Sequence, residues 1–369
     1  MRKSIVTLGA IILFALLAAC QGTATPASAP SGAPPSARPA GPTAAAPAAA
    51  GKAAPAATPT VGGPPPAPVP AAAGKIVYAK EGGLWTLEPA TGKISQLLTI
   101  PASTSLASPA VSPDGSRIAY SLYDTQQALA KKDNGTDLYV VGGDGKNPKL
   151  LAPHQEVGAW LSEPTWTGDG KTVLFSRRDA KGKERIDRVA ADGTGRATVM
   201  ADRISPSVVG DRLAYLVTDA QAYTVDLWVA DTSGQNPRRL LGDPEFQALG
   251  APRLSPDGQR IAFVGVGGPD RPSPRGQGVA PLDPWAWLRP RAAEAHGIPY
   301  YLWSVNIDGS DLRRLTLDLE VELPVTAWSP DGKWLTFVSD RGLNLVSADG
   351  KEVHFVAAEF AVGGMDWTK

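Results

Sequence analysis

Residues 255–264 read Ser-Pro-Asp-Gly-Gln-Arg-Ile-Ala-Phe-Val, a tight turn followed by a short apolar strand. In such a turn proline presets φ, the aspartate accepts hydrogen bonds from nearby backbone N–H groups, and glycine takes the left-handed conformation. The residues after the turn alternate in polarity with a period of two, which predicts a β-strand. This stretch decides the fold because the chain repeats it.

Closely similar turns begin at Ser112, Thr167, Ser255 and Ser329, and an aromatic residue closes the strand six positions after each aspartate. A fifth copy, at residues 209–211, is two residues shorter. A second signature occurs six times. It is an apolar residue in the third strand of each repeat, followed by a turn and a fourth strand. Its copies are Leu84-Trp85, Leu138-Tyr139, Ile186-Asp187, Leu227-Trp228, Leu302-Trp303 and Leu343-Asn344. Four short antiparallel strands repeated at about 40 to 45 residues predict the blades of a β-propeller.

The two ends of the repeat region complement one another. Residues 365–369 match the strand that precedes the turn at Ser329, and they stop where that turn would begin. Residues 75–78 read as a second strand that lacks its first. Joining the two ends completes a blade and removes open sheet edges. We therefore predict six blades, with seven as the alternative.

The Ser-Pro-Asp-Gly turns followed by Arg-Ile-Ala-Tyr or Arg-Ile-Ala-Phe, and the strand ending Arg-Arg-Leu-Thr at residues 313–316, resemble the repeats of TolB-like six-bladed β-propellers. The resemblance extends over residues 75–369. It implies an all-β, six-bladed propeller closed by pairing of the C-terminal strand with the first blade. It says little about activity, because many unrelated functions occupy this architecture.

The N-terminus predicts export and lipidation. Two basic residues precede an apolar run from Ile5 to Ala19, which is typical of a signal peptide over residues 1–19. Residues 17–20 read Leu-Ala-Ala-Cys and resemble a bacterial lipobox, and Cys20 is the only cysteine in the chain. We expect Cys20 to carry the lipid that holds the protein at the cell membrane or the outer membrane, on the extracytoplasmic side. The alternative is an ordinary signal peptide with an incidental cysteine.

Residues 20–74 comprise the lipidated cysteine and a predicted disordered tether. From Gln21 to Gly74 the chain contains 20 alanines and 14 prolines, without an aromatic residue. Such a segment cannot build a core, and its prolines favour extended polyproline II. Aromatic and β-branched residues appear together from Lys75 onward, so the folded domain is expected over 75–369.

Charge and motifs exclude several function classes. The whole chain has 36 basic and 36 acidic residues; without Arg2, Lys3, Arg38 and Lys52 the propeller keeps 32 basic residues, a net charge of −4. No basic patch for a phosphate backbone is visible, so nucleic acid is not expected as a partner. His154, His296 and His354 show no metal-ligand spacing and are expected on the surface or in loops. The turn aspartates are explained by their turns, and we expect no metal, no cofactor and no catalytic residue.

One segment departs from the repeat. Gly267 to Ile298 is inserted between the second and third strands of the fifth blade, with a short helix expected over 284–296. A smaller insertion, Leu122 to Thr136, occupies the same point of the second blade, so both are expected on one face. Candidate binding residues in the larger insertion are Trp285, Trp287, Arg289 and Arg291, since tryptophan and arginine are enriched at interaction hot spots. The alternative is a flap whose tryptophans simply pack onto the propeller.

Three function classes are consistent with these features. The first, which we favour because no catalytic constellation converges, is a protein-interaction platform that binds envelope proteins. The second is a glycan or small-ligand binding propeller that uses Trp285 and Trp287. The third is a polysaccharide-cleaving enzyme with carboxylates in the central channel, because channel-lining residues come from separate strands and leave no sequence motif.

Overall fold

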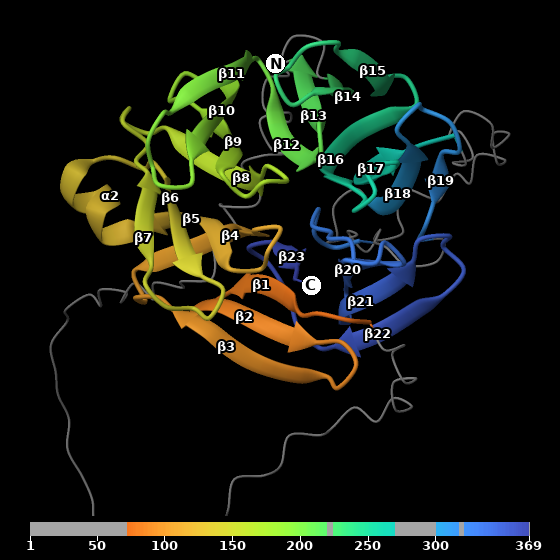
Figure 1. The fold of residues 1–369 in the computed structure, drawn as a ribbon, viewed down its shortest axis with the longest axis horizontal. Coiled ribbons are helices and arrows are strands. Elements are labelled where there is room, and N and C mark those ends of the chain that lie inside the picture. Colours follow the sequence, from red (N-terminus) through yellow and green to blue (C-terminus); the bar gives the residue numbers. More distant parts are fainter. Residues whose placement is uncertain (1–71, 220–223, 270–299, 317–320, 369) are drawn as a thin grey trace, which may run out of the picture. The chain divides into compact units, whose positions relative to one another are not determined.

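The computed structural model describes residues 72–219, 224–269, 300–316 and 321–368, which form six small β-sheets around a central axis (Figure 1). Five sheets have four strands and one has three. The six-bladed, all-β prediction is confirmed, and the seven-bladed alternative is wrong. The predicted signal peptide, Cys20 and all of the tether before Ala72 lie outside the described residues.

The first three blades each have four strands, ordered here from the innermost to the outermost. Blade 1 has β23 (Met365–Trp367), β1 (Ile76–Lys80), β2 (Gly83–Glu88) and β3 (Lys93–Thr99). Blade 2 has β4 (Thr104–Val111), β5 (Arg117–Asp124), β6 (Asp137–Gly142) and β7 (Lys149–Ala152). Blade 3 has β8 (Trp160–Trp166), β9 (Thr172–Arg178), β10 (Glu184–Ala190) and β11 (Ala197–Ala201).

The other three blades have the same order. Blade 4 has β12 (Ile204–Val209), β13 (Arg212–Asp219), β14 (Thr224–Asp231) and β15 (Arg238–Leu241). Blade 5 has β16 (Phe246–Leu254), β17 (Arg260–Gly267), β18 (Tyr301–Asn306) and β19 (Arg313–Arg314). Blade 6 has β20 (Trp334–Ser339), β21 (Gly342–Ser347) and β22 (Val353–Ala357).

The innermost segment of blade 6 is held in a different way from the other five. Trp328 and Leu335 form an isolated bridge in place of a regular ladder. Thr326 Oγ1 donates to the carbonyl of Thr336 at 2.8 Å, and Thr336 Oγ1 accepts from the backbone N–H of Ala327 at 2.8 Å. Two buried threonines therefore add side-chain hydrogen bonds to the few backbone bonds that this segment makes, from Thr336 to Ala327 and from Ser329 to Trp334.

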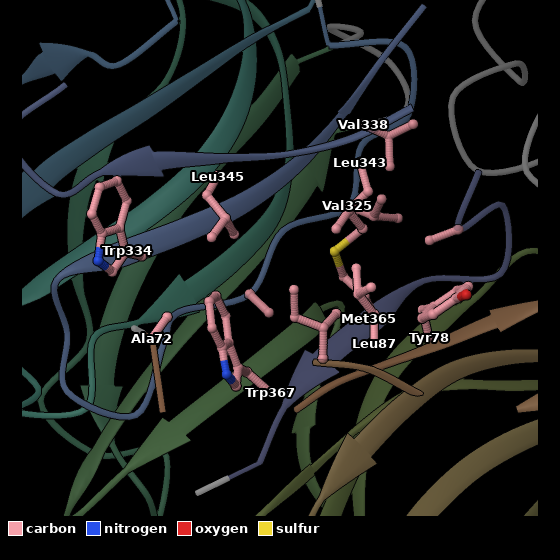
Figure 2. Packing of buried hydrophobic residues seen from close by; sticks show 13 residues of the cluster. Ala72, Tyr78, Leu87, Val325, Trp334, Val338, Leu343, Leu345, Met365 and Trp367 are labelled. Carbon is pink, nitrogen blue, oxygen red and sulfur yellow. The ribbon is translucent and has the colours of Figure 1, made fainter. Parts of the chain in front are cut away.

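The ring closes as the two ends of the repeat predicted. β23 pairs antiparallel with β1, with Ile76 opposite Trp367 and Tyr78 opposite Met365. A buried cluster from blades 6 and 1 packs around this junction and includes Trp334, Leu345, Met365 and Trp367 (Figure 2). Since burying such side chains stabilises a fold by about 1.5–3 kcal/mol each, a three-residue strand is enough to fasten the ring.

The innermost strands share a bulge that recurs around the axis. Ser108, Glu163, Ser205 and Ala251 have φ values of 53°, 51°, 54° and 48°, and each precedes a proline. Register shifts in the pairing with the second strand fall at the same places. A left-handed non-glycine residue often marks a functional site. Here its repetition in four blades shows that it belongs to the architecture.

Candidate functional site

Two opposite faces of the propeller differ in their connections. Because the strands of each blade are antiparallel, the turns after the first and third strands emerge on one face. The connections between second and third strands, and those between blades, emerge on the other. Both insertions interrupt second-to-third connections, so we call this second face the insertion face. The expectation of a shared face is confirmed for the smaller insertion and for the two strand ends that flank the larger one.

The flanks of the larger insertion are fixed even though Trp285, Trp287, Arg289 and Arg291 lie outside the described residues. β17 and β18 remain paired as far as Gly265 and Tyr301. Gly268 donates from its backbone N–H to the carbonyl of Glu245 at 2.8 Å. A Cβ on Gly268 would lie 2.4 Å from Cζ2 of the buried Trp303, so this position requires glycine. The blade is therefore complete up to the points where the insertion leaves and returns.

The smaller insertion contains a helix that the sequence did not predict, α2 (Thr125–Lys131). The side chain of Asp124 caps its first turn by accepting hydrogen bonds from the backbone N–H groups of Gln126 and Gln127. Lys132 ends the helix in the left-handed conformation. Within the helix, the side chain of Ala128 is buried, whereas that of Leu129 is 72% exposed.

His154 joins this insertion to the connection between blades 2 and 3. Its Nδ1 lies 2.6 Å from Oδ1 of Asp137, at the start of β6, and its Nε2 lies 2.8 Å from Oδ2 of Asp133, just after α2. The other oxygen of Asp133 accepts hydrogen bonds from the backbone N–H groups of Gly158 and Gly135, at 2.7 and 3.1 Å. His154 lies in a loop, as expected, but the enclosure of its ring by two carboxylates was not predicted.

The two carboxylates set the charge of this histidine. Burial of the ring disfavours the imidazolium, but the hydrogen bonds and charges of Asp133 and Asp137 outweigh this, and the pKa of His154 is raised. Burial also opposes ionisation of Asp133, yet its hydrogen bonds with His154, Gly158 and Gly135 lower the pKa of that carboxyl. The pair is therefore stable as an imidazolium and a carboxylate.

Gly135 makes room for the histidine. A Cβ at this position would lie 2.5 Å from Cδ2 and 2.7 Å from Nε2 of His154. A pocket of about 150 Å³ opens beside the ring, lined in part by Leu122, Asp124 and Tyr139. This volume is below the roughly 300–1,000 Å³ of typical small-ligand sites, so the pocket suits a side chain better than a whole ligand.

Large apolar side chains are exposed on both faces. On the insertion face, Leu129 is 72% exposed, Val157 67% and Phe360 44%. On the opposite side, Leu150 and Val353 begin outer strands and are 47% and 43% exposed. Leu129 precedes Asp133 by one helical turn, and Val157 is adjacent to Gly158. The contact between Asp133 and Gly158 therefore places the two most exposed apolar residues on adjoining segments.

The turn aspartates have the structural role that the sequence predicted. Asp114 Oδ1 accepts hydrogen bonds from Ser112 Oγ at 2.6 Å and from the backbone N–H of Ser116 at 3.0 Å. The hydrogen bond from Ser112 is the largest of several that lower the pKa of Asp114. Among the residues that the structure describes, no group of three or more His, Cys, Asp or Glu side chains is placed to hold a metal ion.

Carboxylates near the axis serve the framework. Glu163 accepts hydrogen bonds from Ser176 and Ser205, at 2.8 and 2.9 Å, which links blade 3 to blade 4. Asp366 accepts one from the backbone N–H of Val111. Burial raises the pKa of the Asp366 carboxyl, although Val111 and Arg253 favour its ionised form.

Within the described ranges no helix is long and apolar enough to cross a membrane.

Comparison with known proteins agrees with this architecture. The family model of the lipoprotein LpqB beta-propeller domain matches residues 82–271. A stretch of 108 residues is 35% identical to the Tol-Pal system protein TolB of Bordetella pertussis, covering 26% of this chain and 24% of that protein. The match thus spans about a quarter of the length of this curated relative.

Two solved structures share the fold at low identity. TolB from Acinetobacter baumannii superposes with a TM-score of 0.57 and 17% identity, over 80% of this chain and 67% of that chain. A chain of the nidogen/laminin complex gives a TM-score of 0.56 and 11% identity, over 80% and 98% of the two chains. The predicted TolB-like six-bladed propeller is confirmed.

Proposed function

The chain belongs to the family of lipoprotein LpqB beta-propeller domains, and from this membership we propose that it is a membrane-anchored, extracytoplasmic propeller that binds other proteins of the cell envelope. The family description names lipoproteins, and the curated relatives are components of the Tol-Pal system. Both support an envelope location.

The lipobox at residues 17–20 supports anchoring through Cys20. Each lipid methylene buried in a bilayer contributes about 0.8 kcal/mol, so two or more acyl chains hold a protein at a membrane stably. Residues 21–74, rich in alanine and proline, would then serve as the spacer between the lipid and the propeller.

The observation that carries the binding proposal is that the smaller insertion and both strand ends that flank the larger one lie on one face of the ring. Blades 2 and 5 are three apart in a ring of six, so the two insertions leave the ring at opposite sides. Leu129 and Val157 expose apolar surface beside the first insertion. Trp285, Trp287, Arg289 and Arg291 of the second insertion would add aromatic and guanidinium contacts, the types most enriched at binding hot spots.

Site-specific photo-crosslinking in cells tests this proposal. A photo-reactive amino acid is placed at Leu129 or Val157, and in matched variants at Leu150 or Val353, which are exposed apolar residues of the opposite face. We expect illumination to give a discrete protein adduct from Leu129 and Val157 only. Adducts confined to Leu150 and Val353, or no adduct from any of the four positions, would contradict a protein-binding insertion face.

A further inference from the structure

The ring of His154 is placed between two acceptors. An ionised carboxylate can only accept hydrogen bonds, and a carboxylate lies within 2.8 Å of each ring nitrogen. A neutral imidazole carries one N–H and one lone pair, so it can donate to only one of the two. The other nitrogen would then direct its lone pair at a carboxylate oxygen, which is repulsive. When both carboxylates are ionised, this geometry therefore requires both nitrogens to be protonated.

We infer that residues 125–136, which connect β5 to β6, form a proton-dependent strap that is closed when His154 is an imidazolium and released when its ring loses a proton. Asp133 is the contact that changes. Asp137 also binds the backbone N–H of His154, at 2.8 Å, and so keeps the ring on its own side when the charge is lost. The weaker partner is then Asp133, on the strap.

The charged groups around the ring agree with this assignment. Asp133 and Lys131 face it from the strap, and Asp124 and Asp137 from the ends of β5 and β6. The phenol of Tyr139 also lines the pocket. Its pKa is raised, by burial first and then by the charges of Asp137 and Asp124, so it stays neutral while His154 titrates.

The connection that carries His154 is itself held firmly. Glu156 pairs with Arg177 of β9 at 2.9 Å, and Arg196 donates to the carbonyl of Pro153 at 2.6 Å. Movement after deprotonation is therefore expected in the strap and not in this connection.

The pH range is set by the two pKa shifts. Because the pKa of His154 is raised, its contribution is fully present below the ordinary histidine value of about 6.5 and is lost as pH rises through the raised value. Because the pKa of Asp133 is lowered, its contribution is lost only in strong acid. The strap is thus closed below pH 6.5 and is released as pH rises through the raised pKa of His154. Any effect of the strap on a partner bound at Leu129 rests on the proposed function, whereas the release of the strap by deprotonation does not depend on that function.

Hydrogen exchange and histidine NMR on the full chain test the strap without any partner. His154→Gln identifies the His154 ring signals. The reporters are the amides of Gly135 and residues 125–133, corrected for the intrinsic effect of pH on exchange. We expect their exchange to accelerate roughly tenfold as His154 deprotonates, the change that loss of one charge-assisted hydrogen bond produces. The matched control is the amide of Lys183, bound by Asp179 in the equivalent connection of blade 3, which has no histidine.

Asp133→Asn gives the sharpest second variant. The amide oxygen of asparagine still accepts from Gly135 and Gly158, while its NH₂ group donates to a neutral His154 ring. We expect the pKa of His154 to fall and the strap amides to stay protected at the pH at which the parent strap is released. Gly135→Ala, whose Cβ would collide with the ring, should instead release the strap at every pH.

Two results would overturn the inference. One is a His154 ring that, in the parent protein, has a single proton at a pH where the strap amides are protected. The other is strap exchange that does not change as His154 titrates, or that accelerates in Asp133→Asn at the same pH as in the parent. Neither result depends on partner binding, so failure of the strap and failure of the proposed function are distinguishable.

Discussion

Oδ2 of Asp366 accepts a hydrogen bond from the backbone N–H of Val111 at 2.7 Å, although the two residues are 255 positions apart. Asp366 lies in the last strand of the chain and Val111 at the end of the innermost strand of blade 2. The same link recurs at other blade junctions. Thr165 accepts from the backbone N–H of Val208 at 3.2 Å, and Ser207 from that of Leu254 at 2.9 Å.

Tryptophan supplies a second kind of link. Trp166 Nε1 donates to the carbonyl of Ala110 at 3.0 Å, and Trp328 Nε1 to that of Arg253 at 2.9 Å. Trp367 Nε1 donates to the carbonyl of Ala73, just before β1, at 3.1 Å. The junctions from blade 1 round to blade 6 are therefore each tied by one of these two kinds of hydrogen bond.

Ser207→Ala tests the first kind of link. The substitution leaves the N–H of Leu254 without its acceptor in a buried position. We expect the free energy of unfolding to fall by about 1–3 kcal/mol, the cost of a buried unsatisfied donor. Thermal denaturation measures this as a lowering of Tm by several degrees. Ser233→Ala, at an exposed turn, is the control and should change stability by less than about 0.5 kcal/mol. Equal effects of the two variants would show that the link contributes nothing.

Deletion of residues 364–369 tests the closure. It removes β23, with the buried Met365 and Trp367, and opens the edge of β1. Loss of large core side chains costs about 2–5 kcal/mol each, comparable to the 5–15 kcal/mol of a typical domain. We expect no cooperative melting transition by circular dichroism. A truncated chain that melts cooperatively near the Tm of the parent would contradict closure by this strand.

Deletion of residues 269–297 tests the independence of the larger insertion. β17 and β18 pair up to Gly265 and Tyr301, and blades 1, 3 and 6 make this connection with two to five residues. We expect Tm to change by no more than a few degrees, although this deletion removes many more residues than the one at the C-terminus. A large loss of thermal stability would mean that the insertion packs onto the propeller as a necessary part of its core.

Cys20→Ala tests the predicted anchor. Without the thiol no lipid can be attached, so we expect the protein to move from the membrane fraction to the soluble extracytoplasmic fraction. Fractionation and immunoblotting measure this, with Ser28→Ala in the tether as a matched control that stays with the membrane. Unchanged membrane association of Cys20→Ala would contradict the lipoprotein assignment.

Much of the fold could be predicted because its signals are local. The turns at Ser112, Thr167, Ser255 and Ser329 each combine residues with a fixed conformational preference, and the six copies of the third-strand signature count the blades. The closure could also be predicted, because an incomplete first copy and an incomplete last copy complement one another. The missing regular inner strand of blade 6 could not be predicted, because the turn signature that follows it at Ser329 is the same as in the blades whose inner strand is regular.

The candidate site was less predictable. α2 is short and begins at Asp124, a residue that caps helices but is equally common in turns. The environment of His154 depends on Asp133 and Asp137, which lie 21 and 17 positions away in sequence. No local pattern brings these three together; only the return of the chain between blades 2 and 3 does so. The compact sequence Asp133-Asn134-Gly135 was the one available signal, since such residues often position a side chain beside a tight turn.

The affinity of the crosslinked partner for four surface variants tests the central claim most directly. Leu129→Asp and Val157→Asp alter the insertion face, and Leu150→Asp and Val353→Asp are the matched changes at exposed apolar residues on the other side. We predict that Kd rises about tenfold or more for the first pair, which corresponds to about 1.4 kcal/mol, and changes less than about twofold for the second. Weakening by Leu150→Asp and Val353→Asp, with full affinity retained by Leu129→Asp and Val157→Asp, would contradict the assignment of binding to the insertion face.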